Sequence, residues 1–103
     1  KQMIYMAKNI KAEEAYRIGL VNAVFPQEEL MGAARKMAEC IAGNAPIAVR
    51  NCKKAINEGL QVDMDQALVI EEHLFGTCFE SHDQKEGMGA FLEKRKEKHF
   101  INR

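Results

Sequence analysis

A helix with unusual features is predicted by the segment Ser81-His82-Asp83-Gln84-Lys85-Glu86-Gly87-Met88-Gly89-Ala90-Phe91-Leu92-Glu93-Lys94-Arg95. Ser81 stands three residues before Gln84, which is the spacing of a capping box at a helix start. Asp83 stands three residues before Glu86 and offers a second capping box. The segment therefore predicts a helix that begins near Ser81.

The end and the middle of this segment carry further information. Glu93 to Lys96 gathers positive charge where the negative end of the helix dipole is expected, so we predict that the helix closes on these residues. Gly87 and Gly89 lie inside the predicted helix, where each costs roughly 1 kcal/mol relative to Ala. We therefore expect another surface to pack closely against the backbone at the two glycines.

The composition is that of an ordinary folded domain. The chain has 103 residues, of which 47% are hydrophobic and 29% charged, which argues against disorder. Net charge is zero, with 15 basic and 15 acidic residues, so a uniformly basic nucleic-acid binder is excluded. No apolar run reaches the length of about 18 residues that a membrane span requires, and no signal peptide is visible. Because the first residue is Lys, we expect the chain to be part of a longer reading frame.

Cysteine and histidine spacing gives no metal or disulfide pattern. The three cysteines are widely separated, which is typical of free thiols in a reducing compartment, and we expect a cytoplasmic protein. The histidines form no i,i+4 pair with one another or with a cysteine, so no metal site is predicted. These residues are Cys40, Cys52, Cys78, His73, His82 and His99.

The rest of the chain predicts a mostly α fold of four to five helices with one short strand or extended segment. Residues 12–19 suggest a short helix that Gly19 ends and that Lys11 caps only weakly. Residues 20–25 are rich in β-branched and aromatic side chains and suggest the extended segment. Amphipathic patterns predict longer helices over 28–42, 46–58 and 63–79, and residues 3–7 resemble the end of another. In the helix over 46–58 we expect Ala48 or Val49, Cys52, Ala55 and Ile56 to face inward.

Few residues suggest chemistry. Glu71 falls on an apolar helix face, where it is either a general acid or, as we favour, an interfacial or ion-paired residue. Phe75, Phe79 and Phe91 are core residues by default, and stacking on a ligand ring is the alternative. The basic run after Glu93 is either a solvated helix end or a phosphate contact. No catalytic constellation emerges, and these patterns alone indicate only a helical module.

Two motifs give a more specific indication. Residues 12–26 resemble the "AEEA…GLV…VVP" segment of the enoyl-CoA hydratase/isomerase (crotonase) family, and residues 83–95 closely resemble its C-terminal signature "D-x-x-EGM-x-AF-x-EKR". Between them, Ala45 to Ala48 and Leu74-Phe75 stand where the family often has "P-x-A" and "LF". The chain is most similar to bacterial short-chain enoyl-CoA hydratases (3-hydroxybutyryl-CoA dehydratases). The one departure is Lys11, where the family usually has a capping Ser or Thr.

The resemblance implies that this chain is the C-terminal region of such an enzyme. Residues 1–26 would be the end of the β/α spiral core, and residues 27–103 the C-terminal helical domain that covers coenzyme A and joins subunits into trimers paired as hexamers. The spiral core itself, with the oxyanion hole and the two catalytic glutamates, would lie upstream. No catalytic residue is therefore assigned in this chain, and Glu71 and Glu72 are not the catalytic pair.

The resemblance also implies binding residues. Phe75 would line the acyl or pantetheine end of the pocket, and Phe91 and Lys94 would approach the adenine and phosphates of coenzyme A. The parent would be a lyase of fatty acid metabolism that hydrates a trans-2-enoyl-CoA; the acyl-CoA is its substrate and it needs no cofactor. The alternatives are a non-catalytic helical interaction module, or the same region of an isomerase or another crotonase-family enzyme.

For the chain alone, we predict no activity and self-association. The stripes around Met3/Ile4 and Phe75/Phe79 would meet the core or another subunit in a complete protein. Left bare, they exceed the few hundred Å² of apolar patch that a monomer tolerates. A dimer or a domain-swapped assembly would cover them.

Overall fold

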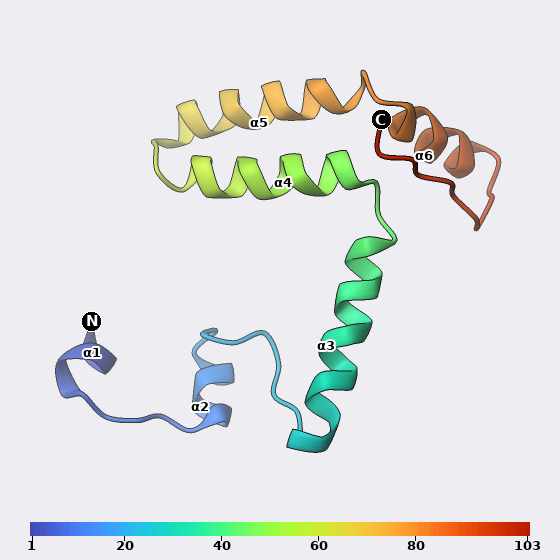
Figure 1. Ribbon diagram of the computed structural model, residues 1–103. Coiled ribbons are helices and arrows are strands. Elements are labelled where there is room, and N and C mark those ends of the chain that lie inside the picture. The colour runs from blue at the N-terminus through green and yellow to red at the C-terminus, as the bar shows by residue number, and fades with distance from the viewer. The chain divides into compact units, whose positions relative to one another are not determined.

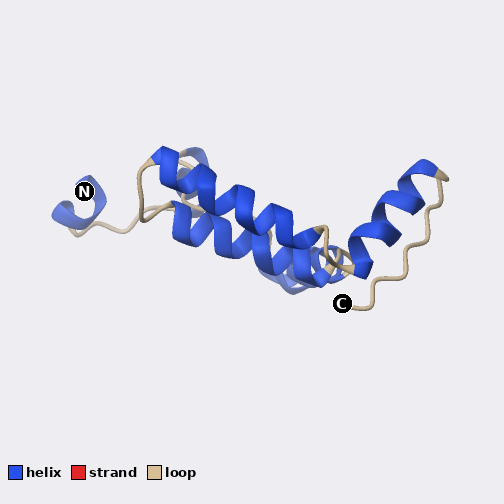
Figure 2. Cartoon of the chain, turned by 90° about the horizontal axis from the view of Figure 1, so that it is seen from above, coloured by secondary structure: helices blue, strands red, loops and turns tan.

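The computed structural model describes residues 1–103, and it consists of helices and connecting segments without a strand (Figures 1 and 2). The expected mostly α fold is confirmed. There are six helices rather than four or five, because the first residues form a short helix of their own. They are α1 (Gln2–Met6), α2 (Ala12–Arg17), α3 (Gln27–Ala42), α4 (Pro46–Gly59), α5 (Met64–Cys78) and α6 (His82–Leu92). None of them is long and apolar enough to cross a membrane.

The segment over residues 20–25 does not form the strand that its composition allowed. It consists of bends over residues 20–22 and irregular backbone over residues 23–25. A strand needs a partner for its backbone N–H and C=O groups, and the chain has no second strand to supply one. The β-branched side chains therefore favour a strand over residues 20–25, but this chain supplies no second strand with which the segment could pair.

The residues fall into two compact units, Lys1–Met37 and Ala38–Arg103. The division that we expected at residue 26 stays a prediction, because compactness within the chain does not test it. In the first unit, α2 begins at Lys11 without a side-chain cap, as expected. Its last residue is Arg17, and Gly19 follows at the C′ position with a positive φ of 75°, in the left-handed region that this position favours.

Helix α3 has the amphipathic pattern predicted for it, but its apolar stripe is uncovered. Leu30, Met37 and Ile41 are each about half exposed, and the helix has no buried residue. The pattern thus predicted the amphipathic helix correctly, and the side chains of its apolar stripe are exposed.

Helices α4 and α5 form an antiparallel hairpin, the most extensive helix packing in the structure (Figure 1). Near the turn, a Cβ at Gly59 would lie 3.4 Å from the Ala67 Cβ, so two small residues allow the helices to approach. Farther along, Leu74 is buried at 7% exposure. Asp63 caps the start of α5, accepting from the Gln66 N–H at 3.0 Å.

The inward face of α4 differs from the predicted one. Cys52 and Ile56 are exposed, whereas Asn51 and Ala55 are half-buried against α5. The Asn51 side-chain amide donates to the Leu74 carbonyl at 3.0 Å and to the Thr77 hydroxyl at 2.8 Å. The prediction was correct for Ala48, Val49 and Ala55, which are half-buried, and wrong for Cys52 and Ile56, because it took only apolar residues as inward. A helix repeat of 3.6 residues puts Asn51, Ala55 and Gly59 on one face, and the polar member is satisfied by hydrogen bonds.

Candidate functional site

Helix α6 begins at Ser81, as one of the two capping boxes predicted. The Ser81 hydroxyl accepts from the Gln84 N–H at 3.1 Å and donates to the Cys78 carbonyl at 2.6 Å. Ser81 is itself 7% exposed, so the cap also joins α6 to the end of α5. The cap was predictable because both partners lie within three residues of each other.

Asp83 does not form the second capping box. Its side chain is buried, with the residue 1% exposed, and it binds the C-terminal end of the chain. One carboxylate oxygen accepts from the Ile101 N–H at 2.7 Å, and the other accepts from the Asn102 N–H at 2.9 Å. The Arg103 carbonyl in turn accepts from the His82 N–H at 2.6 Å. A buried carboxylate is thus fully occupied by backbone donors, and a free N–H of the helix start finds an acceptor.

Glu86 binds the same C-terminal segment one turn later. The Arg95 guanidinium donates to both Glu86 carboxylate oxygens, at 3.0 and 3.1 Å, and the His99 N–H donates at 3.0 Å. These bonds, the Arg95 pair first, lower the pKa of Glu86 from 4.5 to about 2. The same pairing, with a further hydrogen bond to Glu93 at 2.6 Å, raises the pKa of Arg95. Arg95 is therefore committed to carboxylates of its own chain.

The helix ends earlier than predicted. Its last residue is Leu92, and Lys94 has a positive φ of 57°. The Arg95 N–H bonds the Ala90 carbonyl at 2.8 Å, and the Lys94 N–H bonds the Phe91 carbonyl at 3.2 Å. This is the Schellman pattern, with Lys94 at the left-handed C′ position. The basic residues consequently lie beyond the helix, and the expectation that they form its last turn was wrong.

The two glycines of α6 face their own chain. A Cβ on Gly87 would lie 3.6 Å from the Phe100 ring, and one on Gly89 would lie 3.9 Å from the Arg95 guanidinium. Close approach to the helix backbone was expected. The residues that approach belong to the chain's own C-terminal segment, and they leave room for a methyl group.

The candidate binding residues lie on two helices. Phe91 is 76% exposed on the last turn of α6, three residues before Lys94, which is also exposed. Phe75 lies on α5 and is 64% exposed. It meets Phe79 edge to face, with ring centroids 5.1 Å apart. The structure thus brings Phe91 and Lys94 together at one helix end and pairs Phe75 with a different aromatic residue.

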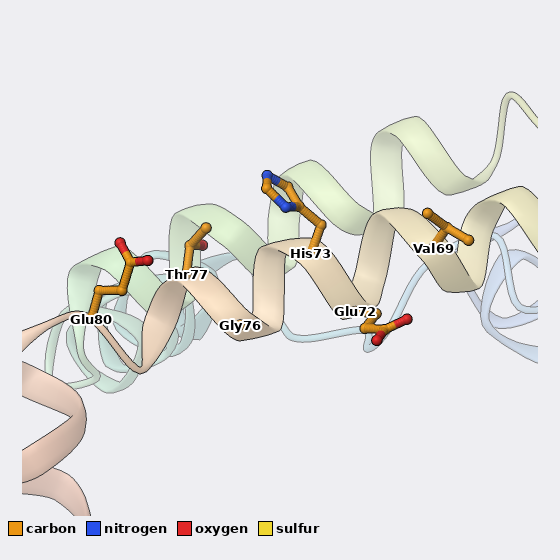
Figure 3. Close-up of a pocket in the computed structure, with 6 residues that line it drawn as sticks. All are labelled: Val69, Glu72, His73, Gly76, Thr77 and Glu80. Carbon is orange, nitrogen blue, oxygen red and sulfur yellow. The ribbon is translucent and has the colours of Figure 1, made fainter.

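No catalytic arrangement forms elsewhere. Glu71 is exposed, without an ion-pair partner, and no three His, Cys, Asp or Glu side chains converge as a metal site would require. A shallow, open hollow runs along α5 (Figure 3), and Figure 3 shows Glu72 pointing away from His73 and Thr77. Such an open surface excludes no water and brings no acid and base together. Its lining residues are Val69, Glu72, His73, Gly76, Thr77 and Glu80.

Comparison with known proteins identifies the class to which this helical region belongs. A sequence profile described as enoyl-CoA hydratase/isomerase matches residues 1–101. The chain therefore belongs to the enoyl-CoA hydratase/isomerase family.

Individual relatives in this family match all or nearly all of this chain. The short-chain-enoyl-CoA hydratase of Clostridium acetobutylicum is 54% identical over 103 residues, covering 100% of this chain and 40% of that protein. The crotonyl-CoA hydratase of Syntrophomonas wolfei is 54% identical over 96 residues, covering 93% of this chain and 37% of its own length. The crystal structure of enoyl-CoA hydratase from Bacillus anthracis superimposes with a TM-score of 0.94 at 40% identity, over 100% of this chain and 40% of that one. This chain thus spans about 40% of the length of these relatives.

Proposed function

We propose that this chain serves as the C-terminal region of an enoyl-CoA hydratase, which reversibly hydrates a trans-2-enoyl-CoA to a 3-hydroxyacyl-CoA. The observation that carries the proposal is the 54% identity to a short-chain-enoyl-CoA hydratase across the entire chain. The acyl-CoA is then the substrate and no other cofactor is required. The relatives named above are bacterial, and a cytoplasmic location belongs to the proposal.

Within this function, Phe91 and Lys94 bind the nucleotide end of coenzyme A. Phe91 exposes an aromatic face that suits stacking on a purine. Lys94 forms no ion pair with the chain, unlike Arg95 beside it, so its ammonium is available to a phosphate. Phe75 forms part of the acyl or pantetheine end of the pocket, and its exposed ring next to Phe79 supports that role.

The chemistry of hydration resides outside this chain. No acid–base pair and no enclosed cavity occur in it, and each oxyanion-hole donor that it lacks is worth roughly 2.7–4 kcal/mol of transition-state stabilisation. We therefore expect the isolated chain to hydrate crotonyl-CoA no faster than buffer. In the complete protein, its uncovered helix faces contact the remaining part of the same subunit and neighbouring subunits of a trimer or hexamer.

The test places this chain in the Clostridium acetobutylicum relative, in exchange for the 103 residues of that protein that align with it. We expect this full-length protein to hydrate crotonyl-CoA, while the chain alone does not. Turnover by the chain alone, or none by the full-length protein when it is folded, contradicts the proposal. Conversion of a 3-enoyl-CoA to a 2-enoyl-CoA without hydration would support the isomerase alternative instead.

The binding residues are tested in the same full-length protein. Lys94→Gln is expected to raise the dissociation constant of coenzyme A, because the ammonium is lost and the side-chain length is kept. Lys85→Gln is the matched control, since Lys85 is an exposed lysine of α6 that lies outside the basic run and forms no ion pair. Equal dissociation constants for Lys94→Gln and the unaltered protein would remove Lys94 from the site.

A further inference from the structure

The last nine residues of the chain form a strap along α6. The strap is defined as Arg95–Arg103, and it runs back beside the helix so that the C-terminus lies near the helix start (Figures 1 and 2). It has no regular secondary structure. Its backbone conformation therefore depends on what α6 provides along its length.

Three contacts fix the strap to α6. At the near end, Glu86 holds the Arg95 guanidinium and the His99 N–H. In the middle, the Phe100 ring lies over the bare backbone of Gly87. At the far end, the buried Asp83 carboxylate accepts from two successive backbone N–H groups, those of residues 101 and 102. The carboxylates stand one helical turn apart on one face of α6, and both are occupied by strap donors.

Lys94 is the residue at which the chain turns from α6 into the strap. It occupies a left-handed conformation, which is strained for an ordinary L-residue. The same motif ends α2, and there the position holds Gly19. A conformation of this kind persists when the surrounding structure determines it, and such positions concentrate at binding sites. In this chain the determining structure is the strap, because Arg95 and the following residues are tied to α6.

The two cationic residues at the turn, Lys94 and Arg95, differ in their ion-pair partners. Arg95 is neutralised by Glu86 and Glu93, so it holds the turn closed. Lys94 has no ion-pair partner and lies on the exposed side of the turn, one helical turn from the exposed Phe91 ring. The Arg95 guanidinium is thus paired with carboxylates of its own chain, while the Lys94 ammonium stays available to a ligand.

We propose that Asp83 and Glu86 are positioning residues, which hold the strap on α6 so that Lys94 and Phe91 keep the geometry that takes the nucleotide end of a coenzyme A thioester. The proposal rests on the proposed function for the ligand. The Asp83 and Glu86 carboxylates accept their hydrogen bonds from the strap, and the two residues act through Lys94. Releasing the strap lets Lys94 leave the left-handed turn, which displaces its ammonium relative to Phe91.

The test measures coenzyme A binding and hydration in the full-length protein described above. Asp83→Asn replaces an acceptor oxygen by an amide that faces a backbone donor, and Glu86→Gln removes the charge that holds Arg95. We expect each variant to raise the dissociation constant of coenzyme A about three- to tenfold, which is in the lower part of the range of couplings between residues in one network. Amide hydrogen exchange at residues 99, 101 and 102 should speed up in the same variants. Asp65→Asn, at an exposed aspartate of α5, is the control and should change neither quantity.

Two readouts separate positioning from general loss of structure. Crotonyl-pantetheine lacks the nucleotide, so its kcat/KM should stay unchanged in Asp83→Asn while that of crotonyl-CoA falls. Adding Asp83→Asn to a Lys94→Gln protein should give no further loss of coenzyme A affinity, because both changes remove the same contact. Equal losses with both thioesters, or additive effects in the double variant, overturn the proposal. If Asp83→Asn does not fold, Glu86→Gln carries the same comparisons.

The outcome also distinguishes this inference from the proposed function. If Lys94→Gln leaves coenzyme A binding unchanged, the assignment of the binding surface fails. If Lys94→Gln weakens binding and neither strap variant does, the binding surface stands and the positioning role of Asp83 and Glu86 is refuted.

Discussion

Asn51 is the residue that joins α4 to α5 through polar contacts. Its side-chain amide reaches the Leu74 carbonyl, the Thr77 hydroxyl and the Cys78 sulfur, the last at 3.4 Å. These bonds connect residues 23 to 27 positions apart in the sequence. Because the hairpin buries few large apolar side chains, this polar connection contributes a large part of what determines the relative register of the two helices.

We expect Asn51→Ala to destabilise the full-length protein by roughly 1–2 kcal/mol, since a hydrogen-bonded donor is lost and its acceptors stay half-buried. In a protein of that size the thermal midpoint should fall by about 2–4 °C per kcal/mol. Asn57→Ala on the exposed side of the same helix is the matched control and should shift the midpoint by much less. Equal shifts for the two variants would show that the Asn51 bonds contribute no net stability.

The stability that Glu86 contributes by binding the strap depends on pH. Its pKa lies at about 2, below the ordinary 4.5, because the folded protein binds the charged carboxylate through Arg95 and the His99 N–H. A lowered carboxylate pKa contributes stability that is fully present above about pH 4.5 and is lost as the pH falls toward 2. We expect the difference in unfolding midpoint between the unaltered protein and Glu86→Gln to shrink as the pH is lowered through this window. A difference that is constant from pH 6 to pH 3 would contradict the assignment.

At the scale of elements, α6 shows which glycines tolerate a side chain. A methyl group at Gly87 would meet the Phe100 ring at 3.6 Å, which is ordinary van der Waals contact. We therefore expect Gly87→Ala to stabilise the protein by up to about 1 kcal/mol through the better helix propensity of Ala. Thermal or urea unfolding of the full-length protein measures this.

Gly32→Ala in α3 is the reference for this change, because nothing lies within 4 Å of a Cβ at Gly32. A gain at Gly32 with a loss at Gly87 would mean that a surface from outside this chain packs on α6 at Gly87. A gain of stability from alanine at both positions would show that Phe100 is the only close neighbour of Gly87.

Helix starts and ends were predictable where their signals are local. Asp63 and Ser81 cap α5 and α6 through residues three positions away, and Gly19 ends α2. The end of α6 was missed because a lysine occupies the C′ position where glycine is the usual signal. The apolar stripe of α3 was also visible in the sequence. Periodicity reports which face is apolar, and it carries no information on whether another part of the chain covers that face.

The strap was not predictable for a different reason. The contacts of Asp83 join residues 18 and 19 positions apart, and they are made to backbone N–H groups that every sequence possesses. The i,i+3 spacing of Asp83 and Glu86 was noticed, and it has a local explanation as a capping box that competes with the long-range one. Phe91 and Lys94 entered as binding candidates through family resemblance, because an exposed phenylalanine and a lysine carry no ligand signal by themselves.

The whole molecule has very little core of its own. The buried hydrophobic residues are Ala15 in the first unit and Leu74 and Ala90 in the second. Hydrophobic burial is the main favourable term in folding, and each large side chain contributes roughly 1.5–3 kcal/mol when it is covered. Three small or medium side chains cannot offset the conformational entropy of 103 ordered residues. We therefore expect surfaces outside this chain to supply most of the stability of both units.

The isolated chain should consequently self-associate. Ile4, Phe75 and Phe79 are 75%, 64% and 51% exposed, and they belong to the stripes that we expected to be left bare. Dimers or domain-swapped assemblies would cover these side chains with little change in the fold of each chain. Sedimentation velocity at increasing concentration should show a growing weight-average mass.

A double variant tests whether the aromatic stripe drives that association. Phe75→Ser with Phe79→Ser removes two exposed rings whose burial is worth roughly 1.5–3 kcal/mol each. The dissociation constant should rise at least about tenfold per ring, because 1.4 kcal/mol corresponds to a factor of ten. Leu60→Ser is the control, since Leu60 is 77% exposed in the turn between α4 and α5 and lies outside both stripes. A chain that remains strictly monomeric at high concentration would contradict the argument, and equal effects of the control and the double variant would move the association surface away from the aromatic pair.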